Sequence, residues 1–269
     1  MPNNHSKDLS DTGNRTDRLS KKDFQDLGKI LLTIGTLLMS AGANSRRIRT
    51  TVERISEAFG VSTDLLITHR ALMLTVNDDD EAQHHSSLKR TSPHGVNFKL
   101  VSGISRMSWH VHDDNWSLEQ INLELDRLVA LPHYPRIIIL LMVSLAGASF
   151  CYLFGGNWMD MLVAFGATFA GLFIKQETAK RDFNPYLCVF FASFTAALFA
   201  IVFVRYGNIS EHALATSVLF LVPGVPLINS FSDLIDGNIM NGIVRSLNGL
   251  MISFAIALGL LLAMQLFPI

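Results

Sequence analysis

Five long apolar runs after Tyr134 constrain the fold of this chain more than any other feature. Each contains close to the ~20 apolar residues that a helix needs to cross the hydrocarbon core of a bilayer. Before Tyr134, charges of both signs are dense. The pattern predicts an α-helical polytopic membrane protein with a small N-terminal α+β cytoplasmic domain. The five transmembrane helices are expected near residues 136–154, 158–174, 185–204, 213–232 and 243–266.

The composition divides the chain into three predicted segments. Residues 1–19 are polar and predict a disordered tail. Residues 20–131 form the predicted cytoplasmic α+β domain, and residues 132–269 the five-span transmembrane domain, with Pro132 and Pro135 marking the boundary. Lys and Arg number 22 against 23 Asp and Glu, without a basic cluster, so nucleic-acid binding is not expected.

Within the N-terminal domain, helical periodicity begins at Ser20 and ends at Gly60, with a bend expected at residues 41–43. Strands are predicted at 65–68, 72–76 and 96–101, with residues 82–95 as a loop. A last helix is expected to begin at Ser117, capped with Gln120. The domain is therefore expected to combine helices with a small sheet.

Two polar clusters in this domain resemble metal sites by composition only. The acidic run 78–81 lacks the glycine and the spaced oxygen ligands of a calcium loop, so a solvated hairpin turn is expected. His110 and His112, with the two aspartates that follow them, come from one short segment, which rarely supplies a closed coordination shell. No metal or cofactor is predicted. Without a nucleotide-binding or hydrolase motif, the chain is not expected to be an enzyme.

The basic residues of the short loops predict the orientation in the membrane. One side is expected to be lined by Arg136, Lys175, Lys180, Arg181 and Arg245, and the other only by Arg205. Positive charge is concentrated on the cytoplasmic side of membrane proteins. The N-terminus is therefore expected in the cytoplasm, the C-terminus outside, and the chain in a bacterial inner membrane.

The fourth apolar run is interrupted by Pro223, Gly224 and Pro226. Each proline lacks an N–H, so the carbonyls of Leu219 and Val222 are expected to lose their helical partners. Such a break is tolerated at membrane depth only against protein or a water-filled cavity. The interruption indicates either a transport site or a simple proline-kinked helix, and the residues alone leave both open.

Three polar residues follow this break on one predicted helical face. Asn229, Asp233 and Asp236 are spaced i, i+4 and i+7. In a transport site Asn229 would orient the substrate, while Asp233 would carry a coupling proton or hold a substrate ammonium. Arg245 is the candidate ion-pair partner of Asp233, with Asp236 as a competitor. Alternatively, the acids lie at the membrane–water boundary without a role in transport.

Three arginines, Arg46, Arg47 and Arg49, follow the predicted bend of the first long helix. They either bind an anion or an acidic headgroup, or form a solvated helix face. Exposed charges usually contribute little, so the solvated face is favoured.

Several motifs resemble the threonine/serine exporter family along nearly the whole chain, and within it the large, YjjP-like subunit of the split succinate exporter. The proline–glycine–asparagine–aspartate stretch is the most specific of them. Gly42 and Arg47 are the corresponding candidate residues of the cytoplasmic domain. The motifs are Gly42-Ala43 followed by Arg47, Tyr134-Pro135-Arg136, the stretch 221–229 with Asp233 and Gly237, and Asn241-Gly242 with Arg245.

This resemblance implies an exporter subunit for a small organic acid or a hydroxy amino acid, such as succinate or threonine and serine. Full-length members add a second five-span half, so the resemblance also implies a separate small five-span membrane subunit (YjjB-like) as partner. Two alternatives remain, a membrane-anchored hydrolase-like subunit and a regulatory or scaffolding subunit.

Overall fold

The computed structural model describes residues 20–78, 84–91, 95–132, 134–207 and 211–267. The predicted tail and residues 79–81 of the acidic run lie outside these ranges. The chain divides into two compact units. The first comprises Met1–Leu131 with Ser232–Gly242, and the second Pro132–Phe231 with Ile243–Ile269. The segment Ser232–Gly242, expected within the transmembrane domain, therefore belongs to the N-terminal unit.

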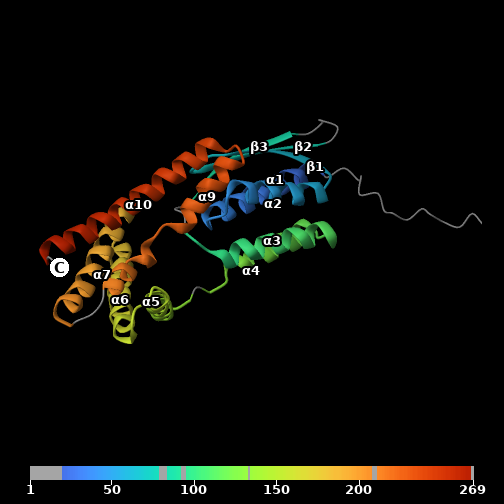
Figure 1. The fold of residues 1–269 in the computed structure, drawn as a ribbon. Helices are drawn as coiled ribbons and strands as arrows, with labels where there is room; N and C mark the ends of the chain where they lie inside the picture. Colours follow the sequence, from blue (N-terminus) through green and yellow to red (C-terminus); the bar gives the residue numbers. More distant parts are fainter. Residues whose placement is uncertain (1–19, 79–83, 92–94, 133, 208–210, 268–269) are drawn as a thin grey trace, which may run out of the picture. The chain divides into compact units, whose positions relative to one another are not determined.

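The first unit is an α+β fold of four helices and a three-stranded sheet (Figure 1). The strands form an antiparallel meander in the order β1-β2-β3, in a register that pairs Leu65 with Leu74. The helices are α1 (Lys21–Ser40), α2 (Ser45–Ala58), α3 (Phe98–Asp113) and α4 (Leu118–Val129), and the strands β1 (Val61–Ile67), β2 (Ala71–Asp78) and β3 (His84–Arg90).

One hydrophobic core holds this unit together. Leu27, Leu31 and Leu38 of α1 are completely buried, as are Leu72 and Leu74 of β2. On α1 these residues recur at helical spacing, and on β2 they alternate with more exposed neighbours, so each element turns one face inward. The helical periodicity predicted for this part of the chain is confirmed.

The predicted helix boundaries of the N-terminal unit are also confirmed. The Ser20 hydroxyl accepts a hydrogen bond from the Asp23 amide at 3.2 Å. α1 ends at Ser40, and the chain turns through Gly42 at φ +88° before α2 begins. Ser117 and Gln120 cap α4 reciprocally, with the Ser117 amide donating to Gln120 Oε1 at 2.8 Å.

Two predicted elements of this unit are wrong. Residues 96–101 are not a strand, because Asn97 caps α3 by accepting from the Leu100 amide at 3.1 Å. Their short alternation was outweighed by the longer helical period that buries Ile104 and Met107. The third strand is instead β3, inside the predicted loop. β3 is largely exposed and polar, so it lacks the apolar alternation that predicts a strand.

Over the residues that the structure describes, the second unit is helical and contains four helices long and apolar enough to span a membrane. A fifth candidate span exists if α8 with η1 and α9 are counted together, since they are joined by a break with a 58° bend. A helical protein with four or five candidate spans is confirmed. The elements are α5 (Arg136–Leu153), α6 (Trp158–Lys180), α7 (Pro185–Gly207), α8 (Glu211–Ser217), the 3-10 helix η1 (Leu219–Leu221), α9 (Gly224–Ile235) and α10 (Ile239–Leu266).

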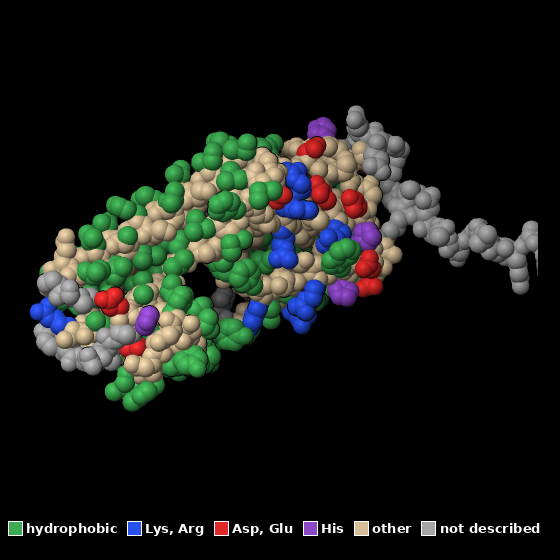
Figure 2. All heavy atoms as spheres, viewed as in Figure 1, with side chains coloured by type: hydrophobic (Ala, Val, Ile, Leu, Met, Phe, Trp, Pro, Cys, Tyr) green, Lys and Arg blue, Asp and Glu red, His purple; other side chains and the backbone are tan. Residues whose placement is uncertain are grey.

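Small residues make the closest helix contacts in this unit. A Cβ added to Gly171 would lie 2.8 Å from the Ala192 carbonyl oxygen, and one added to Gly147 would lie 2.5 Å from Thr168 Oγ1. Hydrophobic side chains dominate the visible surface of these helices, whereas most charged side chains in this view lie over the N-terminal unit (Figure 2). Lipid does not drive apolar side chains together, so close approach of the backbones takes over that role.

Candidate functional site

The break between η1 and α9 satisfies its own backbone groups. The Val222 amide donates to the Leu219 carbonyl at 3.1 Å, and the Gly224 amide donates to the Val222 carbonyl at 2.9 Å. Both carbonyls expected to lose their partners therefore find them locally. Pro226 lies in the first turn of α9, where an N–H would have no intrahelical acceptor. The buried Pro223 separates the helices, so the interruption is a bend between two helices.

Polar side chains connect α9 and α7 to α10 within the second unit. Ser246 donates to Ser230 at 3.0 Å, and the Tyr186 hydroxyl donates to Asn248 Oδ1 at 2.6 Å. Two predicted site residues lie on these helices. Asn229 is half-buried on α9, and Arg245 is half-buried on α10. A neutral hydrogen bond therefore links α9 to α10, and another links α7 to α10.

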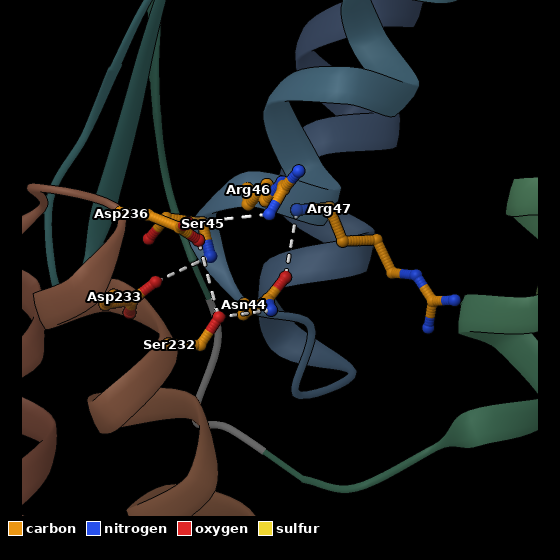
Figure 3. A network of polar contacts seen from close by, with 7 residues as sticks. All are labelled: Asn44, Ser45, Arg46, Arg47, Ser232, Asp233 and Asp236. Atoms are coloured by element: carbon orange, nitrogen blue, oxygen red, sulfur yellow. Dashed lines mark hydrogen bonds and ion pairs between the residues drawn. The ribbon is translucent and has the colours of Figure 1, made fainter.

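The last turn of α9 lies against the N-terminus of α2 within the N-terminal unit (Figure 3). Asp233 is completely buried, and its Oδ1 accepts a hydrogen bond from the Ser45 amide at 2.9 Å. Beside it, Asn44 Nδ2 donates to the Ser232 hydroxyl at 2.9 Å. We call Asn44, Ser45, Ser232 and Asp233 the α2–α9 junction.

The junction completes the N-terminus of α2. The first amides of a helix have no intrahelical acceptor. Asn44 Oδ1 accepts from the Arg47 amide at 2.9 Å, and Asp233 takes the Ser45 amide. A carboxylate at this position also interacts favourably with the positive end of the helix dipole. Asp233 therefore acts as a capping residue supplied from a distant part of the sequence.

Two further contacts attach the segment after α9 to the same unit. Asn241 Nδ2 donates to the Ile67 carbonyl at 2.8 Å in a buried position. Asp236, which follows the end of α9, forms an ion pair with Arg46 at 3.7 Å. The Arg46 side chain is 75% exposed, so this pair contributes little to stability. Asp236 therefore pairs with Arg46, while the pairing of Asp233 with Arg245 stays a prediction.

The two candidate residues of the N-terminal domain have structural positions beside the junction. Gly42 adopts a positive φ, and an added Cβ would approach the Gly95 carbonyl oxygen to 3.3 Å. The turn therefore favours glycine for conformation and for space. Arg47 is exposed, and Figure 3 shows its side chain extending away from Asp233. Its backbone amide, and not its guanidinium, belongs to the network.

Sequence reasoning missed three residues that the structure uses here, Asn44, Ser45 and Ser232, and named Asn241 only as part of a family motif. Asn44 carried a usable signal, because asparagine is a preferred N-cap residue. The partners of Ser45 and Asn44 are 188 residues away in sequence, and a helix end does not identify so distant an acceptor. The pairing of α2 with α9 required the tertiary structure.

The histidines that resembled a metal cluster lie at the C-terminal end of α3. His110 Nδ1 contacts Asp114 Oδ2 at 2.8 Å, and His112 Nδ1 contacts Asp113 Oδ1 at 2.9 Å. Among the described residues, no three His, Cys, Asp or Glu side chains are grouped as metal ligands.

A small α+β unit followed by long apolar helices, with one bent helix pair at a proline, is typical of a multi-pass membrane protein. Residues 29–267 match the family model described as "Putative threonine/serine exporter". The chain belongs to the threonine/serine exporter family.

Two relatives are similar to this chain over nearly their full lengths. The "Probable succinate transporter subunit YjjP" of Klebsiella aerogenes is 27% identical over 250 residues, covering 91% of this chain and 96% of the relative. Its namesake in Escherichia coli K12 is 26% identical over 242 residues, covering 88% and 93%.

A longer relative is matched over part of its length. The "Probable threonine/serine exporter" of Mycobacterium tuberculosis is 18% identical, and the match covers 95% of this chain but 48% of that protein. No solved structure is a significant match. These bacterial relatives are named as transporters and exporters, in agreement with the prediction that the chain is not an enzyme.

Proposed function

We propose that this chain is a subunit of a bacterial inner-membrane exporter of a small organic acid or hydroxy amino acid, of the succinate or threonine/serine type. The observation that carries the proposal is the similarity to succinate transporter subunits over 96% and 93% of their lengths. The broken helix pair adds structural support, because interrupted helices form substrate sites in many transporters.

The proposed partner is a small five-span membrane subunit of the YjjB-like type. The two relatives similar over nearly their full lengths are each named as a subunit, which supports an assembly of more than one chain. Their similarity to this chain extends through the helical unit. A five-span partner would pack against the candidate membrane-spanning helices of this chain.

The proposed transport path follows the interruption of the broken span. Pro223, Gly224 and Pro226 position the N-terminus of α9, whose dipole favours a carboxylate. Asn229 and Arg245, on α9 and α10, would contact the substrate within the same unit.

Asp233 and Asp236 are the acidic residues of the proposed transport path. Asp233 would carry a coupling proton or hold a substrate ammonium, while its contact with Ser45 positions the end of α9. A dicarboxylate would require this acid to be protonated or paired, whereas the ammonium of threonine would favour the ionised form.

The loop charges support an N-terminal unit in the cytoplasm and a C-terminus outside. Lys180 and Arg181 lie at the end of α6, and Arg136 begins α5. A reporter that is active only in the cytoplasm should therefore function at the N-terminus and be silent at the C-terminus. Activity at both ends would contradict this orientation.

The experiment that tests the function measures efflux from bacterial cells lacking their own exporters of these substrates. We expect expression of this chain with the small subunit to accelerate loss of preloaded succinate or threonine, and either chain alone to be inactive. Efflux by the small subunit alone would favour the alternative of a regulatory or scaffolding subunit. Absence of efflux for both substrates with both chains in the membrane would contradict the proposal.

A further inference from the structure

Lys175 lies one residue beyond the span predicted at 158–174, but in the structure α6 continues to Lys180, so Lys175 is part of that helix and is half-buried. Within the ranges that the structure describes, its ammonium makes no hydrogen bond and no ion pair. Arg136 shows the contrast, because it donates to Gln176 at 3.1 Å and pairs with Glu177 at 3.6 Å.

The face of α6 that carries Lys175 is the one packed against other helices. Lys175 follows Thr168 by seven residues and Gly171 by four, so the three share one side of the helix. Both of the earlier residues are buried. A Cβ on Gly171 would meet Ala192 of α7 at 2.8 Å and Phe220 of η1 at 3.0 Å. Lys175 is therefore one helical turn from a contact with the element that precedes the break.

An ammonium in these surroundings needs an anion. Charges within membrane spans are costly unless paired, and those that face the interior of a helix bundle usually belong to substrate or ion pathways. We propose that Lys175 binds a carboxylate group of the transported substrate beside the broken span. The inference rests on the proposed function and deepens it by naming the chemical group that is recognised.

The position of Lys175 along the axis of α6 fits a residue that binds substrate as it enters from the cytoplasm. It lies 175 − 158 = 17 residues after Trp158, about 26 Å along the helix axis. This places it toward the helix end that carries Lys180, which the proposed orientation puts at the cytoplasmic side. An anion entering from the cytoplasm would meet the ammonium early in its path. Succinate and threonine both have a carboxylate, so Lys175 serves either substrate.

The test compares Lys175→Gln with Lys180→Gln, a matched removal of an exposed positive charge on the same helix. Everted membrane vesicles containing the chain and the small subunit are supplied with labelled succinate or threonine. We expect Lys175→Gln to raise the half-saturating concentration about tenfold or more, the size expected for a charged hydrogen bond. Lys180→Gln should leave it unchanged, and Lys175→Arg should restore most of the affinity.

The outcomes separate this inference from the proposed function. Vesicles that take up neither substrate with the wild-type chain would contradict the function itself. Wild-type uptake with the same half-saturation for Lys175→Gln would overturn only the role of Lys175. When both chains are reconstituted into vesicles of defined lipid, an effect of Lys175→Gln that is present with anionic lipid but absent in pure phosphatidylcholine would assign Lys175 to a lipid headgroup and also overturn the inference.

A second measurement needs no variant and covers the case in which Lys175→Gln does not assemble. Wild-type membranes are treated with an amine-reactive ester, and the modified lysines are quantified by mass spectrometry. Succinate should slow the modification of Lys175 and leave that of Lys180 unchanged. Equal modification of Lys175 with and without succinate would overturn the inference.

Discussion

The two units of this protein bury different kinds of side chain. The N-terminal unit buries large ones, including Leu31, Ile34 and Met107 at 2% exposure or less. The fully buried positions of the helical unit are mainly small, such as Ala167 and Ala196. Water drives large apolar side chains into a core, whereas lipid is as apolar as they are, so membrane helices associate through close backbone packing. A leucine side chain therefore stabilises the N-terminal unit by its burial from water, whereas a leucine that faces lipid contributes little to the stability of the helical unit.

The largest expected effect of this contrast is on leucine substitutions. Leu31→Ala removes a completely buried side chain of the N-terminal unit and should destabilise that unit by about 2–5 kcal/mol. Leu261→Ala, at a position 54% exposed on α10, should change stability by less than about 0.5 kcal/mol. Hydrogen exchange of the full chain in micelles measures both, through the amides of α1 and α10. Similar exchange in the two variants would remove the distinction between the units.

In the helical unit, enlarging a small residue at a helix contact should destabilise the protein more than shortening a large exposed residue. Gly171→Leu adds a side chain where even a Cβ would lie 2.8 Å from the Ala192 carbonyl oxygen. Overpacking of this kind costs about 1–3 kcal/mol, so α6 and α7 should separate or shift. Phe173→Leu, at a position 46% exposed on the same helix, is the matched control. The solubilised chain is heated to increasing temperatures, and the folded protein that remains is measured by size-exclusion chromatography. Gly171→Leu should lose folded protein at a lower temperature than the wild type, and Phe173→Leu should not.

The α2–α9 junction follows neither pattern, because it depends on polar contacts. Asp233→Ala leaves the buried Ser45 amide without its acceptor, at a cost of about 1–3 kcal/mol. Exchange of the first amides of α2 should accelerate accordingly, ahead of those of β2. Unchanged exchange at Ser45 would mean that Asp233 does not stabilise this helix end.

Arg46→Ala is the control for this prediction. It removes the exposed partner of Asp236, an interaction that contributes at most about 1 kcal/mol. Exchange at the start of α2 should remain near the wild-type rate. Acceleration as large as in Asp233→Ala would show that the ion pair, and not the buried cap, holds the junction together.

Sequence patterns predicted most of the fold because those features are local. Ser20, Gly60 and the Ser117–Gln120 box act within one helical turn, and their structures match the prediction. The failures have the same explanation. β3 is largely exposed and forms its strand by pairing with β2, so its own residues carry little signal. The segment at 96–101 alternates over too short a window to outweigh the helical period that continues to Val111.

The sequence by itself determined the helical runs, the broken span at Pro223 and the family motifs, because apolar period, proline geometry and motif spacing are written in neighbouring residues. Only the tertiary structure decided that Asp233 caps α2, that Ser232–Gly242 packs with the N-terminal unit, and that Lys175 shares the packed face of α6. These facts depend on contacts between residues far apart in the chain. An acidic or basic side chain looks the same in sequence whether it meets solvent, a helix end or a substrate, so its chemistry is set by the fold around it.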